Sequence, residues 1–246
     1  MKLLDIKNIR KKYHTKKEEI LAVDNFSYQL EQGEFISIVG PSGCGKSTIL
    51  SILSGLIEDY EGEINTNNAK IGYMLQQDSL FEFRTILKNC LLGLEIENKL
   101  TEENKKYVLA LINSYGLTDF INSYPANLSG GMRQRVALIR TLATKPDILL
   151  LDEPFSALDY QTRLVVSDDV YKILKKEGKT AIMVTHDLAE AISMSDKIIV
   201  LSKRPSVIKN IYDIKLDNKS TPIENRKDPK FSYYYDLIWK DIDHHV

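Results

Sequence analysis

The stretch Gly40-Pro41-Ser42-Gly43-Cys44-Gly45-Lys46-Ser47-Thr48 decides the fold of this chain. It follows an apolar run at residues 35–39 and precedes a run with helical spacing at residues 49–53. A strand, a glycine loop and a helix in this order are the setting in which G-x-x-x-x-G-K-[ST] binds phosphate. The glycines let backbone N–H groups approach an anion, and the helix start adds unpaired donors and a positive dipole end. The stretch therefore predicts a phosphate-binding loop.

Two side chains of this loop and two later acids supply the expected chemistry. Lys46 offers a positive charge to the outer phosphates of a nucleotide, and the Ser47 hydroxyl can bind the Mg²⁺ that accompanies them. The apolar run at residues 148–151 ends in Asp152 and Glu153. One carboxylate can orient magnesium while the other polarises an attacking water. On these residues alone, an acidic sheet edge without catalytic work explains the pair equally well.

Composition places the chain among globular proteins with a core. Its 246 residues suit one large domain, and 43% hydrophobic with 27% charged residues is the balance of a soluble protein. With 33 basic and 34 acidic residues the net charge is -1, which argues against a nucleic-acid partner. No apolar run approaches membrane-spanning length and the start does not resemble a signal peptide, so we expect a cytosolic chain or one held at a membrane by a partner.

Hydropathy patterns predict an α/β chain in which a helical segment interrupts a parallel sheet. Alternating residues predict early strands at 2–9 and 21–30, joined by a polar hairpin loop at 11–19 and forming a small antiparallel sheet. Further strands are predicted at 35–39, 61–64, 71–75, 148–151, 180–184, 197–201 and 206–212. Helices are predicted directly after the phosphate loop and at 86–94, 107–115, 164–176, 188–194 and 231–242. We expect one domain spanning 1–246, with an all-helical insertion at about 78–145 and a C-terminal extension at 215–246.

Beyond the phosphate loop and the acid pair, several motifs in order resemble the ABC transporter ATPase family. They are Tyr13, which matches the aromatic that stacks on adenine; Gln76 of the Q-loop; Ser129-Gly130-Gly131 of the signature L-S-G-G-x; Ser156-Ala157-Leu158-Asp159 of the D-loop; and the switch histidine His186. On position alone Tyr13 reads as an ordinary surface tyrosine. The resemblance implies a P-loop NTPase of ABC type, with a RecA-like parallel-sheet core, an antiparallel β-subdomain and an inserted all-helical subdomain.

The resemblance also implies a mechanism. In this family two nucleotide-binding domains dimerise head-to-tail and sandwich two ATP molecules. Gly40–Thr48 and Tyr13 of one copy would then bind ATP, while Ser129, Gly130 and Gly131 of the other copy cap its γ-phosphate and Asp159 lies in the D-loop. Ser47, Asp152 and Gln76 would bind Mg²⁺, with Lys46 on the phosphates. Glu153 would act as the general base and His186 would contact the γ-phosphate.

Three details resemble one branch of the family, the importers of nitrate, sulfonate, taurine and related molecules. They are Met132 after the signature, the segment 155–163, and Ser202-Lys203-Arg204-Pro205-Ser206-Val207-Ile208, which resembles S-x-R-P-G-x-I. Ser206 departs from the usual Gly, and Phe81-Glu82-Phe83-Arg84 departs from Leu-Pro-Trp-x. Importers of thiamine precursors share the same features. The resemblance implies a bacterial importer subunit on the cytoplasmic side of the membrane, held there by permease subunits and served by an extracytoplasmic substrate-binding protein.

Two other functions remain open at this point: the ATPase of an exporter or lipid-handling system, and a soluble ABC ATPase without a transport role. Several single residues are also open. Cys44 stands at a helix start, where the dipole should lower its thiol pKa, although a small residue that merely fits is the simpler interpretation. Phe81 and Phe83 are either core residues or part of a groove for a permease helix. Trp239 is expected to pack against the core.

Overall fold

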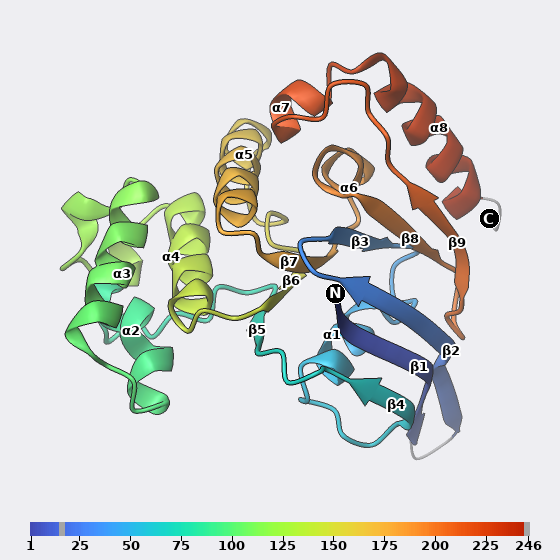
Figure 1. Ribbon diagram of the computed structural model, residues 1–246, viewed down its shortest axis with the longest axis horizontal. Coiled ribbons are helices and arrows are strands. Elements are labelled where there is room, and N and C mark those ends of the chain that lie inside the picture. Colours follow the sequence, from blue (N-terminus) through green and yellow to red (C-terminus); the bar gives the residue numbers. More distant parts are fainter. Residues whose placement is uncertain (15–17, 244–246) are drawn as a thin grey trace.

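The chain folds around two sheets, seen in a computed structural model that describes residues 1–14 and 18–243 (Figure 1). An antiparallel sheet has the order β2-β1-β4, and a larger sheet has the order β5-β6-β7-β3-β8-β9. The first contains β1 (Lys2–His14), β2 (Glu19–Glu31) and β4 (Glu61–Asn65). The second contains β3 (Phe35–Val39), β5 (Ile71–Met74), β6 (Ile148–Asp152), β7 (Thr180–Val184), β8 (Lys197–Leu201) and β9 (Ile208–Asp213). All pairs in the larger sheet are parallel except β8 with β9.

Helices cover both faces of the larger sheet, and α2, α3 and α4 stand together beside it (Figure 1). Helix α1 lies on the face that also carries the antiparallel sheet, while α5, α6 and α8 lie on the opposite face. The helices are α1 (Lys46–Leu53), α2 (Ile86–Ile96), α3 (Glu102–Ser114), α4 (Gly130–Ala143), α5 (Tyr160–Lys176), α6 (Leu188–Met194), α7 (Pro222–Asn225) and α8 (Pro229–Asp243), with short 3₁₀ turns at Thr118–Phe120 and Pro125–Asn127. Within residues 1–14 and 18–243, none of them has the length and apolar character required to traverse a bilayer.

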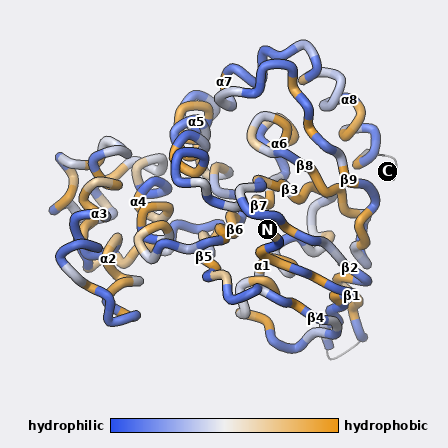
Figure 2. Tube along the Cα trace, viewed as in Figure 1, coloured by the Kyte–Doolittle hydropathy of each residue, from blue (hydrophilic) through white to orange (hydrophobic). Residues whose placement is uncertain are grey.

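The central strands are apolar on both faces because each face packs against its own cluster. In β6, Leu149 and Leu151 contact the helical side, while Ile148 and Leu150 face α1 and the antiparallel sheet. Successive side chains of a strand point to opposite faces, so one unbroken apolar run serves two cores. Figure 2 shows hydrophobic residues concentrated along β3, β6 and β8 at the centre of the molecule.

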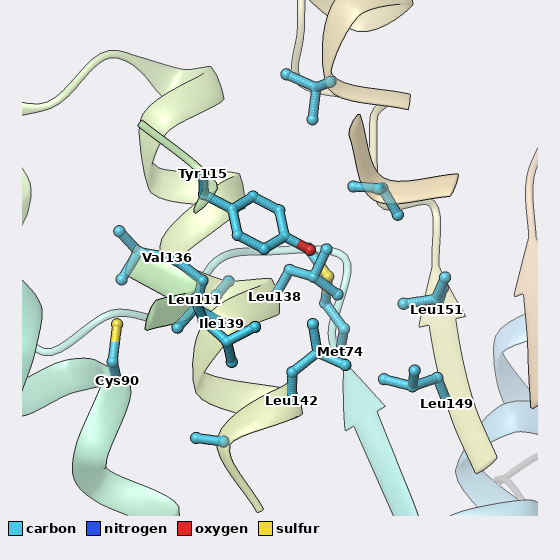
Figure 3. Packing of buried hydrophobic residues seen from close by; sticks show 14 of the residues in the cluster. Met74, Cys90, Leu111, Tyr115, Val136, Leu138, Ile139, Leu142, Leu149 and Leu151 are labelled. Carbon is cyan, nitrogen blue, oxygen red and sulfur yellow. The ribbon is translucent and has the colours of Figure 1, made fainter. Parts of the chain in front are cut away.

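The inserted helices share their core with the sheet. Val136 and Leu142 of α4 belong to the same buried cluster as Leu149 and Leu151 of β6, with Met74 of β5 between them (Figure 3). Thr101 caps α3 by accepting a hydrogen bond from the backbone N–H of Asn104 at 3.2 Å. The helical group is therefore attached to the larger sheet through continuous apolar packing.

The predicted hairpin loop at residues 11–19 is wrong at both ends. Strand β1 continues to His14 and β2 starts at Glu19, so that four residues, 15–18, connect the strands, and the first three of them lie outside the described residues. Lys12 Nζ and His14 Nδ1 lie 3.8 and 3.2 Å from the carboxylate of Glu19, so polar side chains meet across the strands at this end. The polar composition that suggested a loop belongs to a solvent-facing ladder.

The C-terminal extension packs on the sheet in two ways that the sequence pattern did not predict. Residues 215–229, for which no helix or strand was predicted, contain helix α7, and its Asn225 is fully buried and donates to the carbonyl of Ser193 in α6 at 2.7 Å. Helix α8 forms where a helix was expected, but the expectation for Trp239 is wrong. Its side chain is 51% exposed and stacks on Tyr235, with ring centroids 6.1 Å apart. Ile238 is the residue that enters the core.

Ile238 is expected to hold α8 on the molecule. Its side chain is fully buried in a cluster with Ile192 and Val200. We predict that Ile238→Ala lowers the free energy of unfolding by about 2–5 kcal/mol, because a buried cavity replaces the side chain. The neighbouring control Trp239→Ala should cost about 1 kcal/mol or less, since half of that side chain already faces water. Denaturant titration followed by circular dichroism measures both, and equal losses would contradict the assignment.

Candidate functional site

The phosphate loop and two later loops line one cleft of about 490 Å³. Its lining residues are Ser42, Gly43, Gly45, Lys46, Ser47, Thr48, Glu153 and His186. Gly40 and Pro41 complete the loop after β3, and α1 begins at Lys46. Gly45 has φ +121°, and a Cβ there would lie 3.2 Å from the carbonyl oxygen of Ala22. Both the backbone conformation and the close approach of β2 thus require glycine at this point.

Lys46 and Tyr13 lie at two edges of the phosphate loop. The Lys46 side chain is 8% exposed, and its Nζ donates to the carbonyl oxygens of Gly40 and Pro41 at 2.9 and 3.0 Å. This holds the ammonium group inside the loop. Tyr13, at the end of β1, is 38% exposed and its hydroxyl lies 3.4 Å from Thr48 Oγ1. An aromatic ring is therefore present beside the start of α1, where a base stacked on it would be close to the phosphate loop.

Ser47 and Asp152 meet across the loop and offer hard oxygen ligands. Ser47 Oγ donates to Asp152 Oδ1 at 3.1 Å, and the Tyr73 hydroxyl donates to Asp152 Oδ2 at 3.1 Å. Burial raises the pKa of Asp152, while the two hydrogen bonds act in the opposite direction. One carboxylate and one hydroxyl fit Mg²⁺, which typically keeps one or two carboxylates and takes its other ligands from water and substrate phosphates. The residues present thus fit a nucleotide-bound magnesium ion.

Glu153 is held in a strained turn beside two polar partners. Its φ is +45°, a left-handed conformation that a non-glycine residue adopts at a cost. The turn is fixed because Glu153 N–H donates to the carbonyl of Val184 at 2.9 Å and Ser156 donates back to the Glu153 carbonyl. The carboxylate Oε2 then accepts from Gln76 Nε2 at 3.0 Å and lies 3.3 Å from His186 Nδ1. Two other expected site residues, Gln76 and His186, therefore converge on one carboxylate oxygen of Glu153.

Signature residues Ser129, Gly130 and Gly131 lie outside the cleft described above. Ser129 caps α4 by accepting from the N–H of Met132 at 3.3 Å. A Cβ on Gly131 would come within 2.8 Å of Thr162 Cγ2 in α5, whereas a Cβ on Gly130 would make only ordinary contacts, at 3.9 Å from the carbonyl oxygen of Ala157 and 4.0 Å from Leu158 Cδ2. Gly131 is thus required for packing against α5, and the exposed Gly130 amide end remains available to a partner.

Asp159 of the D-loop begins α5 by accepting a hydrogen bond from the N–H of Thr162 at 3.1 Å. The hydrogen bonds from Thr162 lower the pKa of this exposed carboxyl. The charge at the helix start is therefore maintained, in keeping with the preference of helix N-termini for negative groups.

The expected low thiol pKa of Cys44 is contradicted. Its side chain is 1% exposed, and burial raises its pKa even though Lys46 and nearby backbone N–H groups pull in the other direction. The helix start does favour a thiolate, but loss of solvation outweighs that effect here. Cys44 serves as a small buried residue of the phosphate loop.

Two residues at this site escaped the sequence analysis. Tyr73 was noted only as part of a strand, yet it holds Asp152. Arg204 was noted only as part of a branch-specific element, yet its Nε and Nη2 donate to the carbonyl oxygen of Gly43 at 3.1 and 2.8 Å. A polar residue in a strand three positions before the site residue Gln76 was the one signal for Tyr73. The Arg204 contact joins segments 161 positions apart and had no local signal.

Several known proteins resemble this chain in sequence and in fold. A family model described as "ABC transporter" matches residues 23–156. The uncharacterized ABC transporter ATP-binding protein YtlC of Bacillus subtilis is 47% identical over 251 residues, covering 99% of this chain and 96% of its own. The aliphatic sulfonates import ATP-binding protein SsuB of Bacillus cereus is 37% identical, covering 87% and 86%. The dimeric ATP-binding cassette MJ0796 bound to ADP and Pi matches with TM-score 0.76 and 34% identity, covering 86% of this chain and 99% of its own. The expected fold class is confirmed.

Proposed function

Because this chain belongs to the ABC transporter family as an ATP-hydrolysing, ATP-binding subunit, we propose that it powers the import of a small molecule through a separate permease. The observation that carries the proposal is its likeness to SsuB proteins, whose name states import of aliphatic sulfonates, at 34% identity over 98% of this chain in Bacillus anthracis. The cargo is proposed as a small organic or inorganic molecule of the nitrate, sulfonate, taurine or thiamine-precursor kind.

Within the cleft we assign a role to each converging group. Lys46 and the loop amides would hold the phosphates, and Tyr13 the adenine. Ser47 and Asp152, with Gln76 nearby, would hold Mg²⁺, which when bound neutralises phosphate charge. Glu153 would accept the proton of the attacking water, since its carboxylate stands free of any lysine or arginine partner among the described residues. His186 would contact the γ-phosphate.

A second copy of the chain would complete the site. Signature residues Ser129–Gly131 lie outside their own chain's cleft, and they begin a helix whose N-terminal amides favour an anion. Head-to-tail dimerisation on ATP binding would set them over the phosphates bound by the partner copy. The similar cassettes among solved structures are described as dimeric, which supports this arrangement.

The proposed permease contact is a small aromatic surface after the Q-loop. Phe81 and Phe83 are 41% and 78% exposed, with ring centroids 5.4 Å apart. The fully buried Asn89 fixes this loop by accepting from the N–H of Phe81 and donating to the carbonyls of Phe81 and Arg84. A preformed apolar surface suits a permease helix at the cytoplasmic face of the membrane. A peripheral position there and an extracytoplasmic substrate-binding protein are parts of the same proposal, which includes no nucleic acid.

Replacing the proposed base tests the site. Glu153→Gln should lower MgATP hydrolysis by about 100-fold or more, because no group then accepts the proton of the attacking water. The isosteric variant should still bind ATP and accumulate as a dimer on size-exclusion chromatography with ATP. The control Glu63→Gln, on an exposed position of β4, should hydrolyse ATP like the wild type. If Glu153→Gln hydrolyses ATP at the normal rate and stays monomeric with ATP, then Glu153 is not the general base and the proposed dimer mechanism is wrong.

A charge on the aromatic surface tests the permease contact. Phe83→Asp should leave ATP hydrolysis by the free subunit unchanged, because Phe83 is 78% exposed and does not line the cleft. It should abolish co-purification with the permease, since an aspartate cannot be buried cheaply in an apolar interface. Tyr233→Asp, at a 62% exposed aromatic of α8, is the matched control and should co-purify normally. Co-purification of both variants would place the permease contact elsewhere.

Import rather than export is tested with the assembled transporter in liposomes. A candidate cargo is loaded on the substrate-binding protein, which is presented on the side opposite to this subunit. For an importer, ATP hydrolysis should rise only when the loaded binding protein is present. An alkanesulfonate, nitrate and a thiamine precursor are compared as cargo. Stimulation by cargo supplied on the subunit's own side, without any binding protein, would support an exporter.

A further inference from the structure

One arginine connects the two loops that flank the proposed base. Arg163 lies in the first turn of α5, directly after the D-loop (residues 156–159). Its Nη2 donates to the carbonyl oxygen of Leu158 in the D-loop at 3.0 Å. Its Nη1 donates to Asp187 Oδ2 at 3.2 Å, in the switch loop (residues 185–187) that carries His186. The guanidinium therefore spans from one functional loop to the other within a single chain.

The acceptors on the switch-loop side are held in place. Asp187 Oδ1 caps α6 by accepting from the N–H groups of Ala189 and Glu190 at 2.8 and 3.2 Å, so its other oxygen is presented to Arg163. Glu190, whose side chain is 3% exposed, lies 3.7 Å from Arg163 Nε. It accepts from Thr185 Oγ1 at 2.7 Å, and Thr185 Oγ1 in turn accepts from the N–H of Asp187 at 3.0 Å. Thr185 and Asp187, the two neighbours of His186 in the chain, are thus both hydrogen-bonded to the buried residue Glu190.

The charges favour keeping Arg163 where it is. A buried carboxylate is costly without a positive partner, and removing that partner leaves an uncompensated charge. Burial raises the pKa of Glu190 to about 7, and Arg163 and Arg226 pull it down. Arg226 follows α7 in the C-terminal extension, and its buried Nε and Nη2 find no hydrogen-bond partner in the part of the chain that the structure describes. Glu190 therefore lies between a cation from α5 and one from the extension.

We propose that Arg163 is a positioning residue for ATP hydrolysis, which sets the switch loop and the D-loop of one chain in fixed relation through Asp187 and Glu190. No contact between His186 and Arg163 is found; the His186 side chain is 56% exposed, and its Nδ1 lies 3.3 Å from Glu153 Oε2. The second copy would touch the D-loop. Because Arg163 bonds both Leu158 and Asp187, a movement of the D-loop would also move His186, the histidine beside the proposed base. The inference rests on the proposed roles of Glu153 and His186.

The test compares two cations that hold opposite ends of α6. Arg163→Met removes the contact at the N-terminal end. Lys219→Met is the matched control: Lys219 is 24% exposed against 21% for Arg163, and its Nζ donates to the carbonyl oxygen of Ser195 and to Asp196 at the C-terminal end. The full-length variants are purified, and kcat and KM for MgATP, ATP affinity and melting temperature are measured for each.

Arg163→Met should lower kcat by about 10- to 100-fold, as small displacements of a catalytic group do, with KM and ATP affinity within about threefold of wild type. Lys219→Met should lose similar thermal stability but keep kcat within about threefold. If Arg163→Met does not fold, Arg163→Lys carries the test by the same criterion, because one ammonium group cannot bond Leu158 and Asp187 and also reach Glu190.

Two results would overturn the inference: a kcat within threefold of wild type for the Arg163 variant, or an equal loss of kcat in Lys219→Met, which would mark a general stability effect. Glu153→Gln is measured in parallel to separate this failure from failure of the proposed function. If Glu153→Gln is inactive and Arg163→Met is normal, only the role of Arg163 falls. If Glu153→Gln hydrolyses ATP normally, the site assignment falls and the role of Arg163 with it.

Discussion

The site depends on one row of the parallel sheet, in which Val184 of β7 pairs with Ile38 of β3 on one side and with Asp152 of β6 on the other. Parallel strands end at the same edge, so this row brings the phosphate loop, the acid pair and the switch loop together. Backbone hydrogen bonds extend this pairing beyond the ends of the strands: the Glu153 N–H donates to the carbonyl oxygen of Val184, and the Thr185 N–H donates to that of Ile38. Every polar group of the cleft takes its position from that edge.

This row is specified by more than hydrophobic patterning. Strands β3, β6 and β7 are buried on both faces, so alternation of apolar and polar residues does not select their register. The polar residues at the strand ends supply what the pattern lacks. Asp152 reaches both Ser47 and Tyr73 in the observed pairing, and a shift by one residue would turn its carboxylate to the opposite face. The groups proposed for chemistry thus also stabilise the register that positions them.

Most of what the sequence predicted correctly is local, although it missed helix α7 and misplaced both ends of the first hairpin loop. The phosphate loop and the central strands depend on neighbours within a few residues, and these patterns predicted the α/β class, whereas the ABC-type fold was implied by the family resemblance. Features set by distant contacts were missed or wrong: Tyr73 against Asp152, Arg204 against Gly43, and the exposed face of Trp239. Cys44 failed for a related reason, because its pKa balances a local dipole against burial by residues far away in the chain.

The helical insertion is also connected to the cleft by contacts between residues that are distant in the sequence. In sequence it separates β5 from β6, and in Figure 1 its helices α2, α3 and α4 stand beside the larger sheet, away from α1, which follows the phosphate loop. In packing it is continuous with both strands, since α4 shares one buried cluster with Met74 and Leu151. Those residues precede Gln76 and Glu153 by two positions, so a displacement of α4 acts on the backbone that carries both groups. Close-packed cores transmit such strain because they contain few voids to absorb it. Contact of the signature with a second copy can therefore reach the proposed base through apolar packing alone.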